Sequence, residues 1–107
     1  VKQGITKVKQ SMTYSEITFK LGKLPELYLK LNCDETGRFR VSENSVLLDE
    51  KEYDRQQVEN LVVTMGLQIE ENKIILNSSE EEIEDDIFRL IVGCYLIYFM
   101  HYFMELL

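Results

Sequence analysis

The chain has 107 residues, of which 45% are hydrophobic and 29% are charged, values that exclude an intrinsically disordered protein and indicate one soluble globular domain over 1–107. The net charge of −7 is uneven, because residues 1–30 carry six Lys against two Glu (+4), whereas residues 31–107 carry six Lys or Arg against seventeen acids (−11). Such an acidic body disfavours nucleic acid and anionic membranes as partners and favours a protein partner with a basic surface.

The first half of the chain shows the two-residue alternation of β-strands. Residues 11–19 alternate in this way, and so do residues 27–33, which follow Pro25. A turn at 34–37 ends in Gly37 and leads into a further predicted strand over 38–48. Strands 27–33 and 38–48 are therefore expected to form a hairpin.

The second half changes to helical spacing. The pattern predicts a helix over 53–65, with Asp54 as its N-cap and Gly66 at its end. A short hairpin of 67–69 with 73–77 is expected to follow. Ser79 and Glu82 form an S-x-x-E capping box, which predicts that the last helix begins there.

The last helix is apolar around its whole perimeter, since residues 87–107 contain only two formal charges. One side, which includes Leu90, Cys94 and Ile97, is expected to pack on the chain's own core. The other side has the spacing of a heptad repeat and predicts a homodimer. An alternative is that the sheet and helix 53–65 bury both sides within one chain. The predicted dimer interface consists of Phe88, Val92, Tyr95, Phe99, Tyr102, Phe103 and Leu106.

Together these elements predict an α+β fold, in which a small antiparallel sheet packs against two helices, the last of them long and apolar. The uncharged run over 90–104 is shorter than the roughly 20 residues that cross a bilayer, so no membrane span is expected. The N-terminal residues do not resemble a signal peptide, and the two cysteines form no metal or disulfide motif. A reducing, cytoplasmic location is therefore expected.

Clustered carboxylates are the strongest candidate for a binding site. Six acids occur within residues 80–86, and they are able to imitate a nucleic-acid backbone in a basic groove. An alternative is that they only stabilise a helix N-terminus through the helix dipole. The predicted partner-binding residues are Asp49, Glu50, Glu52, Asp54, Glu80, Glu81, Glu82, Glu84, Asp85 and Asp86.

Catalytic and cofactor motifs are not recognisable in the sequence. His101 is the only histidine, and its sequence neighbours supply no nucleophile with which it could act as a base. The five glycines are scattered and form no phosphate-binding loop, and the acids lack the spacing of a calcium loop. We therefore expect a non-enzymatic protein that binds no cofactor and no metal ion.

Three segments resemble a family of uncharacterised bacterial and phage domains of unknown function. They are ELYLKLNCDETGRFRVSEN (26–44), QVENLVVTMGLQIEENKIIL (57–76) and the acidic stretch that leads into an apolar helix (80–99), and the resemblance covers about three quarters of the chain. The chain departs from the family at 42–45, where the family has an acidic turn with glycine. The resemblance supplies no catalytic residues and implies a phage or mobile-element context.

We therefore expect an acidic protein-binding module. More specifically, we expect an anti-CRISPR-like inhibitor that binds a host defence nuclease. The alternative is a winged-helix-like DNA-binding regulator that dimerises through its last helix, because helix 53–65 precedes a hairpin. Its helix would offer Arg55 to DNA but also Asp54 and Glu59, which phosphate groups repel.

Overall fold

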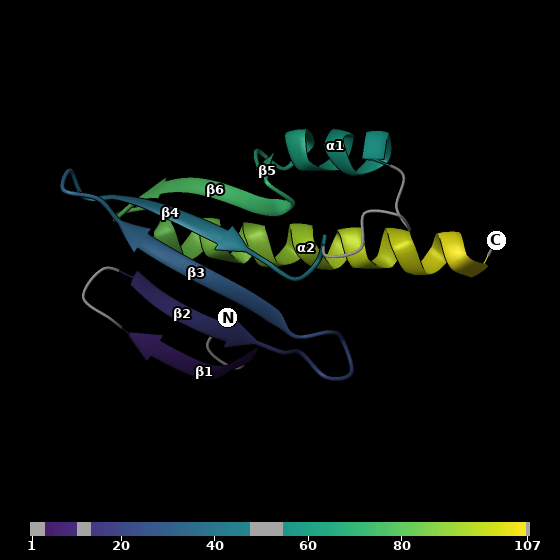
Figure 1. The fold of residues 1–107 in the computed structure, drawn as a ribbon, viewed down its shortest axis with the longest axis horizontal. Helices are drawn as coiled ribbons and strands as arrows, with labels where there is room; N and C mark the ends of the chain where they lie inside the picture. Colours follow the sequence, from purple (N-terminus) through teal and green to yellow (C-terminus); the bar gives the residue numbers. More distant parts are fainter. Residues whose placement is uncertain (1–3, 11–13, 48–54, 107) are drawn as a thin grey trace.

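The computed structural model describes residues 4–10, 14–47 and 55–106, of which Gln10 and 102–106 are described by their backbone only. Six strands form one antiparallel sheet in the order β1-β2-β3-β4-β6-β5, and two helices accompany it (Figure 1). The predicted α+β class, with an antiparallel sheet, two helices and a long apolar C-terminal helix, is confirmed.

Four strands precede the first helix, one more than the sequence predicted: β1 (Ile5–Gln10), β2 (Tyr14–Phe19), β3 (Leu27–Cys33) and β4 (Arg38–Glu43). The additional strand is β1, whose register with β2 shifts between Ile5 and Lys7. That bulge interrupts the alternation of apolar side chains, and the strand pattern is correspondingly weak in the sequence. The predicted hairpin of β3 with β4 is confirmed.

The second predicted hairpin consists of β5 (Gln68–Glu70) and β6 (Lys73–Ser79). Strand β6 also pairs with β4 along its whole length, from Arg38 with Ser79 to Glu43 with Ile74. The hairpin therefore extends the main sheet, and it is not a separate wing beside a helix.

Helix α1 (Arg55–Thr64) ends as the sequence predicted. Gly66 has a positive φ of 72°, and its N–H donates to the carbonyl of Val63 at 3.0 Å. The N–H of Leu67 donates to the carbonyl of Val62 at 2.8 Å, which completes a Schellman motif. The predicted N-cap Asp54 lies outside the described residues.

Helix α2 (Ile83–Leu106) begins later than the capping box predicted. Ser79 is the last residue of β6, and its carbonyl accepts a hydrogen bond from the N–H of Glu82 at 3.1 Å. The first helical hydrogen bond runs from the N–H of Asp86 to the carbonyl of Glu82, at 2.9 Å. Ser79 therefore pairs in the sheet, and residues 80–82 form a turn before the helix.

The core lies between one face of the sheet and the two helices: α2 contacts β6, α1 and β4, and α1 contributes the buried Val58 and Val62. Leu90, Cys94 and Ile97 are fully buried, as predicted for the side of α2 that packs on its own chain. Figure 1 shows α2 across the sheet, with its C-terminal end beyond the strands and α1 above it. Strands β1 and β2 lie away from α2, on the far side of β3.

A buried carboxylate fixes the end of β4. Glu43 is completely buried, and its two oxygens accept four hydrogen bonds. The donors are the N–H of Tyr28 (2.5 Å), the N–H of Ser45 (2.6 Å), the N–H of Val46 (2.8 Å) and the hydroxyl of Ser45 (2.8 Å). These bonds turn the chain after Glu43, so the strand predicted over 38–48 ends at residue 43.

Replacing Glu43 with Gln should destabilise the fold by about 3 kcal/mol, because an amide NH₂ would face buried donors that now bind a carboxylate oxygen. Urea unfolding monitored by circular dichroism measures this change. Glu16→Gln, on an exposed position of β2, is the matched control and should shift stability by less than about 0.5 kcal/mol. Equal effects of the two substitutions would contradict a structural role for Glu43.

Candidate functional site

The acidic segment comprises Glu80, Glu81, Glu82, Glu84, Asp85 and Asp86, at the junction of β6 and α2. The first three occupy the turn, and the other three lie in the first helical turn. All except Asp86 are exposed. The helix dipole favours negative charge in the first turn of α2 and at Glu82, whose carbonyl accepts the first helical hydrogen bond, and the effect is weaker at the more distant Glu80 and Glu81.

Asp86 has a structural role that separates it from its neighbours. Its carboxylate accepts hydrogen bonds from the hydroxyl of Ser78 and from the guanidinium of Arg89, the latter at 2.8 Å. These contacts join the start of α2 to the last residues of β6. Within the part of the chain that the structure describes, the other five carboxylates have no salt bridge or side-chain hydrogen bond, so their charge is directed to solvent.

The second predicted group of acids, Asp49, Glu50, Glu52 and Asp54, lies outside the described residues. The structure therefore brings together the acids of one segment only. Among the described residues, no group of three His, Cys, Asp or Glu side chains is arranged to hold a metal ion.

The two cysteines are free and differ in environment. Cys33 is exposed, whereas Cys94 is completely buried under the sheet. Burial raises the pKa of the Cys94 thiol well above its ordinary value, and the charge of Glu43 raises it further. Cys94 therefore acts as a small apolar side chain of the core and not as a nucleophile.

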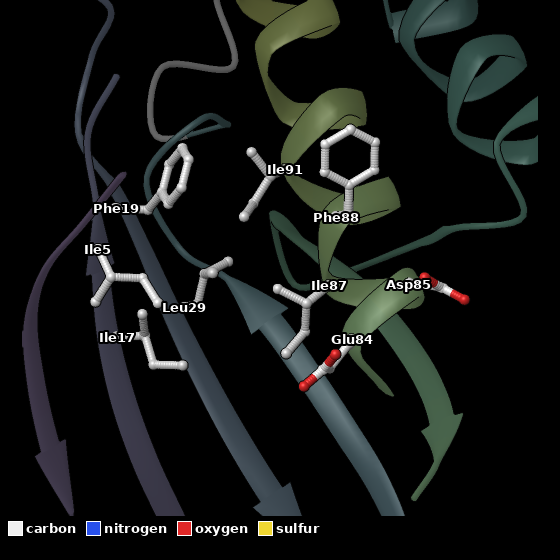
Figure 2. Close-up of a pocket in the computed structure, with 9 residues that line it drawn as sticks. All are labelled: Ile5, Ile17, Phe19, Leu29, Glu84, Asp85, Ile87, Phe88 and Ile91. Atoms are coloured by element: carbon white, nitrogen blue, oxygen red, sulfur yellow. The ribbon is translucent and has the colours of Figure 1, made fainter. Parts of the chain in front are cut away.

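An apolar groove of about 450 Å³ adjoins the acidic segment. We define the groove by its walls: Ile5, Ile17, Phe19 and Leu29 from β1–β3, and Ile87, Phe88 and Ile91 from α2. Figure 2 shows Ile87 and Ile91 of α2 directed toward the strand residues, Phe88 farther from the strands, and Glu84 and Asp85 toward the start of the helix. The site therefore combines an apolar cleft with negative charge.

The groove exists because one helix does not cover the width of six strands. Helix α2 lies over β6 and β4, and the inner faces of β1 and β2 have no helix directly above them. Ile5, Ile17 and Ile87 are accordingly only partly buried. Val8, which pairs with Ile17, is 53% exposed and extends this apolar surface to the edge of the sheet.

The predicted dimer interface on α2 is partly exposed. Phe88 is 56% exposed and Phe99 is 38% exposed, and Leu96, at 39%, lies on the same side of the helix. Val92 between them is half-buried. Nothing is described of the side chains of Tyr102, Phe103 and Leu106.

Tyr95 does not belong to the exposed side of α2. It is 7% exposed, its hydroxyl donates to the carbonyl of Pro25 at 3.1 Å, and its ring lies 6.2 Å from that of Phe19. Burial raises its pKa above the ordinary value of a tyrosine. The chain's own loop before β3 and the end of β2 therefore cover this position, and Leu96 replaces it on the exposed side.

The groove residues of β1 and β2 were not foreseen as part of a site. Their apolar character was visible in the sequence, but only the strand order reveals that Ile5, Val8 and Ile17 lie beyond the reach of α2. The sequence signal for strand β1 is short: Val8 stands between Lys7 and Lys9, an alternation typical of a strand with one apolar and one polar face.

Comparison with known proteins finds no matching family model, no similar curated protein and no similar solved structure. Across the described residues, no helix has both the length and the hydropathy required to cross a membrane.

Proposed function

We propose that this protein is a non-enzymatic, acidic protein-binding module that presents its acidic segment to a basic surface of another protein. The main support is that five carboxylates at one end of α2 are exposed and have no ion-pair partner among the described residues. They belong to Glu80, Glu81, Glu82, Glu84 and Asp85. Such a cluster attracts Lys and Arg side chains and speeds their association through long-range electrostatics.

The concrete form of the proposal is an anti-CRISPR-like inhibitor, encoded by a phage or mobile element, whose carboxylates occupy the nucleic-acid groove of a host defence nuclease. The charge balance of −11 after residue 30 supports it, because a nuclease groove is lined by basic side chains. The phage or mobile-element context is proposed from the resemblance described for 26–44, 57–76 and 80–99, and no family model matches the chain.

The DNA-binding alternative has less support. A winged helix needs a hairpin that is free to contact the DNA backbone, whereas β6 pairs with β4 inside the main sheet. On helix α1, the guanidinium of Arg55 forms an ion pair with Glu59, at 2.9 Å.

The charge hypothesis is tested by pull-down against a panel of CRISPR nucleases in their guide-RNA complexes. The double substitution Glu80→Lys and Glu81→Lys changes the net charge from −7 to −3 and leaves the residues of α2 intact. Loss of these charges should weaken capture by about tenfold or more.

The matched control is Glu35→Lys with Glu71→Lys, two exposed acids in the hairpin turns, which changes the net charge equally. It should retain capture within about twofold of the parent protein. If both double variants and the parent protein capture a nuclease equally well, the proposal that the acidic segment binds the partner is contradicted.

The proposal also includes a homodimer formed through the exposed side of α2, where Leu96 and Phe99 are exposed and do not line the groove. Replacing both with Ser should cost about 3 kcal/mol of association free energy, or roughly a hundredfold in the dissociation constant. Sedimentation velocity over a concentration series measures this change.

Val63→Ser serves as the control for the dimer, since Val63 is 75% exposed on α1. That variant should sediment as the parent protein does. A parent protein that sediments as a single copy at every concentration would contradict the dimer.

A further inference from the structure

We infer that the groove between α2 and β1–β3 binds an amphipathic basic segment of the partner, which inserts apolar side chains into the groove and places Lys or Arg beside Glu84 and Asp85. The inference rests on the proposed function and deepens it: the partner is recognised by an apolar contact as well as by charge. Three observations carry it.

The first observation is the composition of the groove. Apart from Glu84 and Asp85 at one end, its lining side chains are aliphatic or aromatic, and the volume of about 450 Å³ lies within the range of pockets that enclose ligands. Phe88, at 56% exposed, is the most accessible of its wall residues and offers a large aromatic surface at the rim. Burial of such a side chain by a partner is favourable, and its exposure to water is not.

The second observation is the charge at the end of the groove. Glu84 and Asp85 line it, whereas Asp86, the third acid of this helical turn, is already neutralised by Arg89. Over 4–10, 14–47 and 55–101, no Lys or Arg side chain lines the groove. An occupant that carries positive charge next to its apolar side chains therefore complements both parts of the site, and an acidic or purely apolar occupant does not.

The third observation is the position of the basic residues of the chain. Lys9 pairs with Glu16 and Lys30 pairs with Glu16 from the other side, which places all three on the sheet face opposite the groove. Lys30 lies there over the ring of Tyr14, with its Nζ 4.4 Å from the ring centroid. The groove face of these strands is therefore free of the positive charge that would repel a basic segment.

The inference is tested with a short amphipathic peptide of Leu and Lys as the probe, and with a peptide of Ser and Lys of equal charge as its control. Binding is measured by fluorescence anisotropy, and the location by the methyl NMR signals of the isoleucines. The Leu/Lys peptide should bind at least about tenfold more tightly than the Ser/Lys peptide and should shift the signals of Ile5, Ile17 and Ile87.

Two variants locate the contact on α2. Phe88→Ser removes an exposed groove residue and should weaken binding of the Leu/Lys peptide by about tenfold or more. Val63→Ser removes an exposed apolar residue of α1, outside both the groove and the proposed dimer interface, and it should leave affinity within about twofold. Both positions are exposed, and circular dichroism should show unchanged helix content.

The inference is overturned if the two peptides bind equally, if Phe88→Ser and Val63→Ser act alike, or if the groove methyl signals do not move. It is also overturned if the signals of Ile5 and Ile17, which lie outside the proposed dimer interface, shift with protein concentration alone, because a second copy of the chain would then occupy the groove. If both peptides bind equally and the Glu80→Lys and Glu81→Lys double variant binds neither, the charge-based function is supported and the role of the groove is contradicted. If the peptide binds in the groove but no nuclease is captured, the proposal of a nuclease partner is contradicted and the inference of a peptide-binding groove is supported.

Discussion

The structure depends on the packing of one apolar helix against a sheet that is wider than the helix. Helix α2 buries Leu90, Cys94 and Ile97 in the core, and its contacts with the sheet are mainly to β6 and β4. The same contact leaves the inner faces of β1 and β2 half-covered and the opposite side of α2 exposed. The groove and the exposed aromatic side chains thus have one cause: a single helix is too narrow to cover one face of the six-stranded sheet.

Charge and apolar surface meet where α2 begins. The turn that leads from β6 into α2 concentrates carboxylates, and Asp86 secures that turn through Ser78 and Arg89. Glu84 and Asp85 are thereby held on a rigid helical turn at the end of the groove. A site of this kind combines long-range attraction, which selects basic partners, with a local apolar contact, which sets how long they remain bound.

Much of the fold was predictable from the sequence, because periodicity and turn chemistry are local properties. The alternation in 27–33, the turn at Gly37 and the Gly66 ending of α1 all have local causes, and each appears as expected. The failures have non-local causes. Ser79 was assigned to a helix cap but pairs with Arg38, and the strand over 38–48 stops early because Glu43 bonds to Tyr28, fifteen residues away.

The site was only partly predictable for the same reason: its acids are contiguous in the sequence, whereas the groove unites β1, β2, β3 and α2. Tyr95 shows the limit clearly, because helical spacing placed it with Phe99 while Pro25 and Phe19 bury it.

The coverage of the sheet is tested most directly by the accessibility of isoleucine methyl groups to a neutral, soluble paramagnetic gadolinium chelate, measured by NMR on the free protein at low concentration. The account predicts strong broadening of the methyl signals of Ile5, Ile17 and Ile87, which line the groove, and sharp signals from Ile74 and Ile97, which are completely buried. Equal protection of Ile17 and Ile74 would contradict it, because the inner face of β2 would then be covered as fully as the core.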